Sequence, residues 1–212
     1  MELYRTVREE ASASQTIERS RFIAHIRPVD TREEAEEFIA SIRAQYRDAT
    51  HNVPAMVLGD KAQIQWASDD GEPQGTSGAP MVQLLTGEGL TNLVVVVTRY
   101  FGGIKLGTGG LVRAYSSSAR LAVEAAGICS VCRVCRLTVR IEYTFLDRIL
   151  KMAAEDLSQP ESYVIADTDY GEKVTLQLLC QEEDEPKVSA MLANVTSGTA
   201  QLIGSAGELQ RV

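Results

Sequence analysis

Glycines and basic side chains are concentrated in one segment of the chain, a combination typical of backbone loops that bind anions. Five of the nine residues from 102 to 110 are glycine, and Arg99, Lys105 and Arg113 lie in or beside the segment. A plain tight turn needs one or two glycines, so their number favours a site for an anion or an RNA phosphate. The residues expected to form this site are Arg99, Tyr100, Gly102, Gly103, Lys105, Gly107, Thr108, Gly109, Gly110 and Arg113.

The glycine-rich segment matches neither of the two common nucleotide-binding motifs. Gly102 and Gly107 have the spacing of a Walker motif, but Thr108 stands where that motif requires lysine. The dinucleotide motif is also incomplete, because Val112 occupies the position of its third glycine. A turn whose glycines serve only to adopt positive φ is therefore the alternative to an anion site.

Acidic residues form a second candidate site. Asp69, Asp70 and Glu72 carry the oxygen ligands that Mg²⁺ prefers, and His51 is one of only two histidines available as a general base near neutral pH. Together these residues would suit a metal-assisted hydrolase. The alternative is a solvated turn in which Asp69 or Asp70 bonds to nearby backbone.

The cysteines are a third candidate site. Cys129, Cys132 and Cys135 recur at every third position, and a closed zinc site would also need Cys180, the only other cysteine. The apolar residues between the three indicate a strand, along which positions three apart point to opposite faces. We therefore expect buried, reduced thiols, with neither a structural metal nor a cofactor.

The composition is that of a globular protein long enough for two domains. Hydrophobic residues make up 44% and charged residues 24% of the 212 residues. No apolar run approaches the roughly 20 residues of a membrane span, so we expect a cytoplasmic location without membrane contact. The net charge of -8 argues against a surface that wraps nucleic acid throughout, yet no acid lies between Glu88 and Glu124.

The elements that position the candidate residues follow from hydrophobic periodicity and from turn residues. The loop 68–80 is too polar and glycine-rich to be core, and the β-branched run 93–98 indicates a strand covered on both faces. The first half also predicts a hairpin within residues 1–28, a helix from 31 to 42, strands 53–58 and 62–67, a short helix 80–85, and a helix after Gly110 that Gly127 ends.

The second half has a different pattern. It predicts, in order, a strand 137–143, a helix 146–157, strands 163–166 and 173–180, a helix 185–195 and a strand 199–203. This βαββαβ order is that of a split ferredoxin-like domain. The predicted fold class is therefore α+β, with an α/β domain at 1–130, a ferredoxin-like domain at 131–212 and no linker between them.

Three blocks of residues carry a family resemblance. They are Asp-Ala-Thr-His-Asn at 48–52, Ser-Asp-Asp-Gly-Glu-Pro-Gln-Gly-Thr at 68–76, and the stretch 96–115 that contains the glycine-rich segment. In this order they resemble the signature blocks of the IMPACT/YigZ family. The resemblance is specific over residues 15–126, and residues 137–212 resemble more weakly the C-terminal domain of the bacterial YigZ-type members.

The resemblance implies an N-terminal domain of the ribosomal-protein type, similar to domain IV of elongation factor G, and a ferredoxin-like domain similar to its domain V. Eukaryotic IMPACT relatives regulate translation under amino-acid starvation by competing for an activator of a kinase, and bacterial members have no such kinase partner. For a bacterial-type chain the resemblance suggests association with RNA or the ribosome. The first hypothesis is therefore a non-enzymatic, translation-linked protein that contacts RNA phosphate or a phosphorylated ligand through Arg99, Lys105, Arg113 and the glycine-rich segment. Two alternatives stay open, the metal-assisted hydrolase and a protein-interaction adaptor in translation control.

Overall fold

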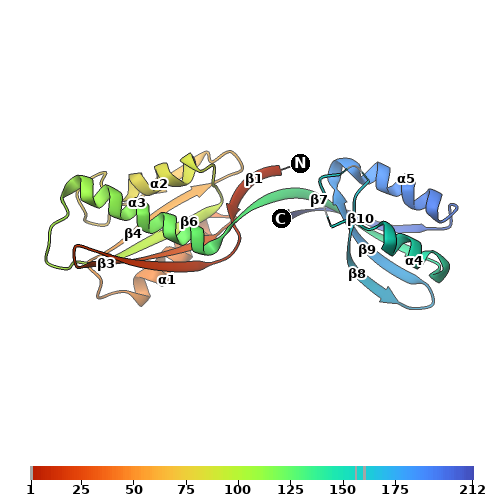
Figure 1. The fold of residues 1–212 in the computed structure, drawn as a ribbon, viewed down its shortest axis with the longest axis horizontal. Coiled ribbons are helices and arrows are strands. Elements are labelled where there is room, and N and C mark those ends of the chain that lie inside the picture. Colours follow the sequence, from red (N-terminus) through yellow and green to blue (C-terminus); the bar gives the residue numbers. More distant parts are fainter. Residues whose placement is uncertain (1, 156, 160) are drawn as a thin grey trace. The chain divides into compact units, whose positions relative to one another are not determined.

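The structure is a computed structural model that describes residues 2–155, 157–159 and 161–212 of the chain. The chain divides into two compact units, Tyr4–Ser130 and Val131–Val212, and the second also includes the first residues of the chain. Each unit has its own hydrophobic core. Figure 1 labels the helices and strands of both units. The predicted two-domain α+β class is confirmed.

The first unit is built on a five-stranded antiparallel sheet. The central strand β6 packs its alternate valines into two different cores, as the continuous β-branched run predicts. It also delivers Arg99 and Tyr100 to the point where the glycine-rich segment begins. The strand order is β2 (Ala11–Ile17), β3 (Ser20–Pro28), β6 (Leu93–Tyr100), β4 (His51–Leu58) and β5 (Ile64–Ala67).

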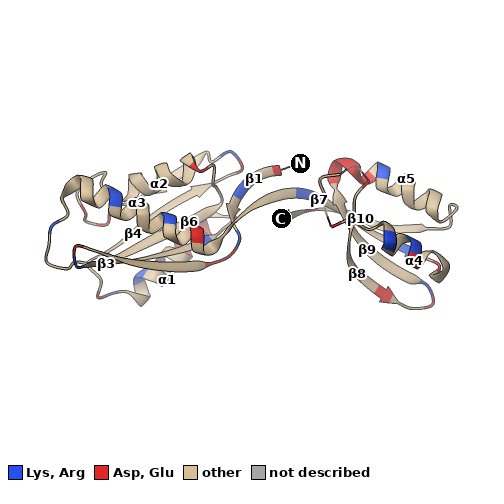
Figure 2. Ribbon diagram, viewed as in Figure 1, with Lys and Arg blue, Asp and Glu red and all other residues tan. Residues whose placement is uncertain are grey.

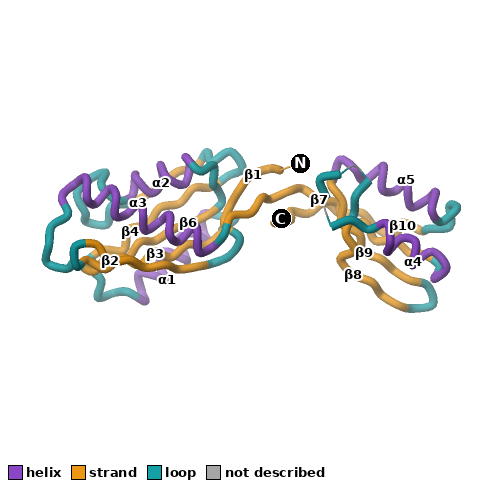
Figure 3. Tube along the Cα trace, in the orientation of Figure 1, coloured by secondary structure: helices purple, strands orange, loops and turns teal. Residues whose placement is uncertain are grey.

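Helices cover both faces of this sheet (Figure 3). On one face lies α1 (Arg32–Gln45), whose first turn is capped by the Thr31 hydroxyl, which accepts the backbone N–H of Glu34. On the other face lie α2 (Gly78–Gly87) and α3 (Gly107–Ala126), which also pack against each other. The loop that contains Asp69, Asp70 and Glu72, which we call the acidic loop, therefore leads into α2. The glycine-rich segment leads into α3.

The second unit has the split ferredoxin-like order that the sequence predicts. Its antiparallel strands run β10-β7-β9-β8 across the sheet, and β1 (Glu2–Val7) also pairs with β7. Its core consists of residues from β7, β9, α4 and α5, with Tyr163. In chain order the elements are β7 (Ile128–Ile141), α4 (Tyr143–Met152), β8 (Val164–Tyr170), β9 (Val174–Gln181), the 3₁₀ turn η1 (Glu182–Asp184), α5 (Glu185–Val195) and β10 (Gln201–Arg211).

Three predicted bounds in this unit were wrong by five residues or more. β7 begins at residue 128 instead of 137, because main-chain pairing extends the strand through its cysteines. β10 continues to residue 211 instead of 203, because pairing with β7 imposes a strand on Gly204–Gly207, which has no side chain typical of strands. The helix predicted to reach residue 157 ends at Met152, and Leu157 packs with Val134 and Leu179 from outside the helix.

Candidate functional site

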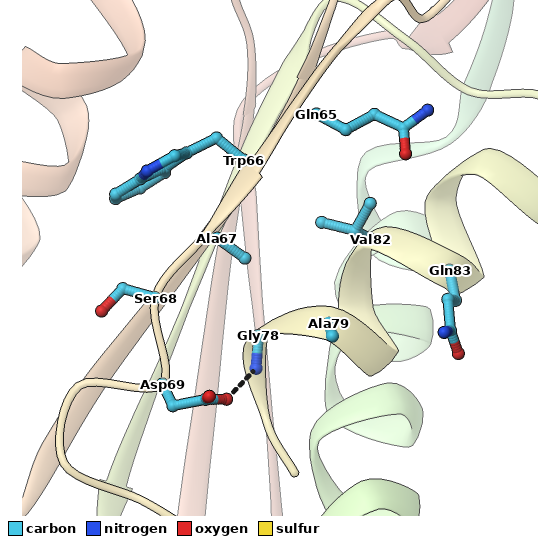
Figure 4. Close-up of a pocket in the computed structure, with 9 residues that line it drawn as sticks. All are labelled: Gln65, Trp66, Ala67, Ser68, Asp69, Gly78, Ala79, Val82 and Gln83. Atoms are coloured by element: carbon cyan, nitrogen blue, oxygen red, sulfur yellow. Dashed lines mark hydrogen bonds between the residues drawn. The ribbon is translucent and has the colours of Figure 1, made fainter. Parts of the chain in front are cut away.

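Asp69 closes the acidic loop and caps α2 across eight residues of sequence. Its carboxylate accepts the backbone N–H groups of Gly75 at 2.7 Å, Ser77 at 3.1 Å and Gly78 at 2.9 Å, and the Ser77 hydroxyl at 2.6 Å. Figure 4 shows this side chain directed at the first residue of α2. Burial alone would raise the pKa of Asp69, but these hydrogen bonds outweigh it and lower the pKa below its ordinary value. Asp69 is thus a structural cap.

Asp70 ties the same loop to the edge of β4. Its carboxylate accepts the backbone N–H of Asn52 at 2.7 Å and the Arg43 guanidinium at 3.0 Å. The Asp70 carbonyl faces His51 Nδ1 at 2.7 Å, so that nitrogen carries the hydrogen of this bond. The other ring nitrogen, Nε2, lies 3.9 Å from the Glu72 carboxylate. His51 therefore acts as a link between loop and strand.

Glu72 lies beneath the loop in the interior of the unit. Its Oε1 accepts Arg99 Nη1 at 2.6 Å and the Tyr115 hydroxyl at 2.8 Å, and all three residues are buried. Burial first, and then the nearby carboxylate, raise the pKa of Tyr115 far above its ordinary value, so its hydroxyl remains a donor. This buried ion pair joins the acidic loop to β6 and α3.

Asp69, Asp70 and Glu72, the candidate ligands of a shared cation, are each bonded within the protein. Each carboxylate is directed at different protein donors, and His51 faces backbone instead of an open site. Within the described residues no group of three or more histidine, cysteine or acidic side chains is placed to hold a metal. The acidic residues therefore do lie close together, but their carboxylates form hydrogen bonds and ion pairs within the protein.

The four cysteines are free thiols and are all buried. Cys135 and Cys180 lie directly opposite each other on β7 and β9. Burial raises the pKa of the Cys180 thiol to about 12, so this group stays protonated and behaves as an apolar side chain.

Arg99 is placed differently from the prediction that it meets an anion at the surface. The residue is only 5% exposed, and its guanidinium carbon lies 5.4 Å from the ring centroids of both Phe22 and Phe101. Besides the Glu72 carboxylate, its guanidinium contacts the Ser20 hydroxyl at 3.3 Å. Arg99 is therefore committed to the interior, where it supports Phe101 from one side.

The acid-free stretch of sequence is not acid-free in space. Arg99 pairs with Glu72, and Arg120 pairs with Glu88, so two of its four basic side chains are matched by acids. Figure 2 shows the Lys and Arg positions in blue and the Asp and Glu positions in red, interspersed along the ribbon of each unit. The two remaining side chains, Lys105 and Arg113, are exposed, and in the part of the chain that the structure describes they make no ion pair or side-chain hydrogen bond.

The glycines of the segment have different reasons to be glycine. A Cβ at Gly102 would collide with the backbone of Arg19, and Gly103 and Gly107 have φ values of +86° and +70°. Gly109 has neither restriction, since a Cβ there would meet only the Arg113 guanidinium at 3.6 Å. At Gly110 the Cβ would lie 3.0 Å from that of Leu106. The turn alternative thus explains some of these glycines but not Gly109.

Two hollows adjoin at the glycine-rich segment, separated by Lys105 and Leu106, which line both. The first, which we call the Phe101 hollow, measures about 370 Å³ and is lined by Glu72, Pro73, Arg99, Phe101, Lys105, Leu106, Gly107, Thr108 and Leu111. The second, the Arg113 hollow, measures about 480 Å³ and is lined by Ile17, Glu18, Ile104, Lys105, Leu106, Gly110, Arg113, Ala114 and Ser117.

The predicted site residues are partly brought together by these hollows. Lys105, Gly107 and Thr108 meet in the first, while Gly110 and Arg113 lie in the second. Tyr100 lines neither, because its hydroxyl donates to Asp48 at 2.9 Å, a bond that raises the pKa of this tyrosine. Phe101 was not among the predicted residues, although a signal was present. Phe101 follows a buried strand and precedes a run of glycines, so it has few apolar neighbours in sequence to pack against, and this indicates that its ring is exposed.

A separate hollow of about 400 Å³ lies between the edge strand β5 and α2 (Figure 4). Ala67 of β5 and Val82 of α2 are directed toward this space, while the ring of Trp66, 38% exposed, is directed to the other side of β5. None of the described residues that line it is basic, so it does not share the charge character of the other two.

Two sequence profiles match the chain. The Impact N-terminal domain matches residues 18–123, and the domain of unknown function DUF1949 matches residues 139–199. The IMPACT family member YvyE of Bacillus subtilis is 38% identical over 199 residues, which cover 94% of this chain and 89% of the relative. The IMPACT family member YigZ of Escherichia coli is 37% identical over 191 residues, which cover 89% and 91%.

The chain was also compared with solved structures. A hypothetical protein known from its crystal structure is 35% identical, with 95% of this chain and 97% of that chain covered and a TM-score of 0.61. The two-domain translational regulator Yih1 is 28% identical over 58% of this chain and 47% of its own, with a TM-score of 0.36.

Proposed function

This chain belongs to the IMPACT family, and from that premise we propose that it is a translation-linked regulatory protein that binds RNA phosphates, free or on the ribosome, through the glycine-rich segment. The contacts assigned to it are the side chains of Lys105 and Arg113 and the backbone of the first turn of α3. Family membership supports the link to translation, and the structure of the segment supports the phosphate contacts.

One observation carries the proposal. Lys105 and Arg113 are exposed, make no ion pair within the described residues, and line the hollow at the start of α3. The first backbone N–H groups of a helix have no intrahelical partner and carry the positive end of its dipole. Gly107, Gly109 and Gly110 leave Thr108 as the one residue with a side chain in this turn, so phosphate oxygens can approach its backbone.

The rest of the surface makes such binding local. The chain carries a net charge of -8, so the surface outside this patch repels phosphates. Contacts to phosphate position a protein on RNA without reading its bases, and we therefore expect weak sequence preference. Arg99 has an indirect role in this scheme, because it holds Phe101 beside the hollow.

No helix in the described part of the chain is both long and apolar enough to cross a membrane. The hydrolase alternative gains no support. The carboxylates that a metal-assisted hydrolase would use are occupied by Ser77, Asn52 and Arg99.

The test is a salt titration of labelled RNA and of ribosomes with the full chain. Lys105→Ala combined with Arg113→Ala should weaken binding uniformly across RNA sequences. Each lost phosphate contact should also flatten the slope of log affinity against log salt by about one unit. Melting temperature should change little, because exposed charges contribute under about 1 kcal/mol each.

The matched control removes two positive charges elsewhere. Arg148→Ala with Lys151→Ala lowers the net charge by the same amount on exposed positions of α4. This variant should keep the wild-type slope. An unchanged slope in the Lys105 and Arg113 variant, or an equal change in the control, would contradict the assignment of the patch.

A further inference from the structure

We propose that the Phe101 hollow takes one unpaired nucleotide of single-stranded RNA, with the base stacked on Phe101 and a phosphate at the first turn of α3. This inference rests on the proposed RNA binding and names the form of RNA that the site selects.

Phe101 has the properties of a stacking platform. The residue is 46% exposed although it is aromatic, and the Arg99 guanidinium lies 5.4 Å from its ring centroid. Arg99 itself is fixed by Glu72 and by the ring of Phe22, so the cation is held rigidly against Phe101. A ring supported in this way can stack a base on its free face at little cost in side-chain entropy.

The walls of the hollow suit a base joined to a phosphate. Its volume of about 370 Å³ lies within the usual range for small-molecule sites. Pro73, Leu106 and Leu111 supply apolar walls, while Lys105 and Thr108 supply polar groups beside the start of α3. The helix N-terminus is thus placed for the phosphate, and the apolar side for the base.

A buried donor without a partner points independently to a ligand. The Arg99 side chain is 6% exposed and lines the Phe101 hollow, and its Nε has no hydrogen-bond partner among the described residues. Buried guanidinium donors are normally satisfied, so an unpaired one beside a hollow is consistent with a ligand that supplies the acceptor.

The geometry favours single strands over duplex. In duplex RNA the bases are paired and stacked, so none can enter a hollow of this size, whereas an unpaired base can be turned outward. The Arg113 hollow lies across Lys105 and Leu106 from the Phe101 hollow, which leaves room for the next phosphate of the same strand. A patch that contacted phosphates alone would bind both forms.

The experiment is fluorescence anisotropy with the full chain and three forms of one 12-residue RNA: single strand, duplex, and a single strand of the same length without bases. The single strand should bind about tenfold more tightly than the other two. Phe101→Leu should lower its affinity about tenfold and leave the salt slope and the other two affinities unchanged. Phe101→Trp should retain binding, and Tyr170→Leu, at a 64% exposed aromatic residue of the other unit, should have no effect.

The outcomes separate this inference from the proposed function. If the wild-type chain binds none of the three RNAs, both fail. If it binds all three equally, with a slope that the Lys105 and Arg113 variant flattens, RNA binding stands and the nucleotide site is overturned. Since these comparisons use the wild-type chain, they hold even if Phe101→Leu lowers the melting temperature. Displacement of the RNA by equimolar adenosine monophosphate would assign the hollow to free nucleotide and overturn its role in RNA binding.

Discussion

The acidic loop at residues 68–78 and the glycine-rich segment at 102–110 look equally suited to chemistry in the sequence, yet the structure uses them in opposite ways. In the acidic loop every candidate carboxylate is bonded to the protein itself. In the glycine-rich segment Lys105 is exposed, and a Cβ at Gly103 or Gly107 would meet nothing within 4 Å. The first region is a support, and the second is a surface.

The difference shows what makes a polar residue available to a ligand. Both regions carry several charged residues within a short stretch of sequence. They differ in how many protein groups lie within hydrogen-bonding distance of those charges, which is several in the acidic loop and few in the glycine-rich segment. The two regions also depend on each other, because Glu72 and Pro73 of the acidic loop line the Phe101 hollow. The acidic loop therefore shapes the site that the glycine-rich segment offers.

The largest effect should come from Glu72→Gln. This change keeps an acceptor for Tyr115 but leaves the Arg99 charge buried without its partner, which should destabilise the first unit by about 3 kcal/mol. Urea unfolding followed by tryptophan fluorescence reports on this unit alone, since Trp66 in β5 is the only tryptophan. The exposed Glu124→Gln is the control and should shift the midpoint little. A loss below about 1 kcal/mol for Glu72→Gln would show that the acidic loop is not the support described here.

A smaller effect is expected from Asp69→Asn, which weakens the cap of α2 and should cost about 1 kcal/mol at pH 7. The folded pKa of Asp69 is lowered from its ordinary value of 3.8, so its contribution is present above that value and is lost as the pH falls through the folded pKa. The stability difference between wild type and variant should therefore shrink below about pH 4. Urea titrations of both proteins at pH 7 and pH 3 measure this difference. A difference that is the same at both pH values would show that the Asp69 carboxylate does not stabilise the start of α2.

The smallest change in stability is expected from Gly109→Ala. A methyl group fits there without positive φ, and alanine favours the helix, so the unit should be unchanged or up to about 1 kcal/mol more stable. RNA affinity should nevertheless fall, because the methyl obstructs the approach to the first turn of α3. Melting temperature and anisotropy titration of the same preparation test both statements.

The matched control for this variant is Gly103→Ala, whose φ of +86° strains any other residue and should cost roughly 1 kcal/mol. Gly110→Ala is a second variant for comparison. Its methyl group would lie 3.0 Å from the Cβ of Leu106, so its stability should be lower than that of Gly109→Ala. Normal RNA binding by a folded Gly109→Ala variant would reject the anion site at this helix and return the segment to a plain turn.

Local patterns in the sequence determined the order of the elements and the two-domain class. The β-branched run predicted a strand buried on both faces, and β6 is such a strand. The polar loop at 68–80 was predicted to lie outside the core, but Glu72, Thr76 and Ser77 are buried and α2 already begins at Gly78. The strand and the order of the elements are set by side-chain periodicity and by turn residues, which act over a few positions and are visible without knowledge of distant partners.

Only the tertiary structure decided which charged groups remain available. Arg99 and Glu72 are 27 residues apart in the chain, and their pairing converts a predicted surface cation and a predicted metal ligand into one buried ion pair. The same folding exposes Phe101 and leaves Lys105 unpaired among the described residues. The physical reason is that the state of a charge depends on the groups within a few ångströms of it, and folding selects those groups from distant parts of the chain.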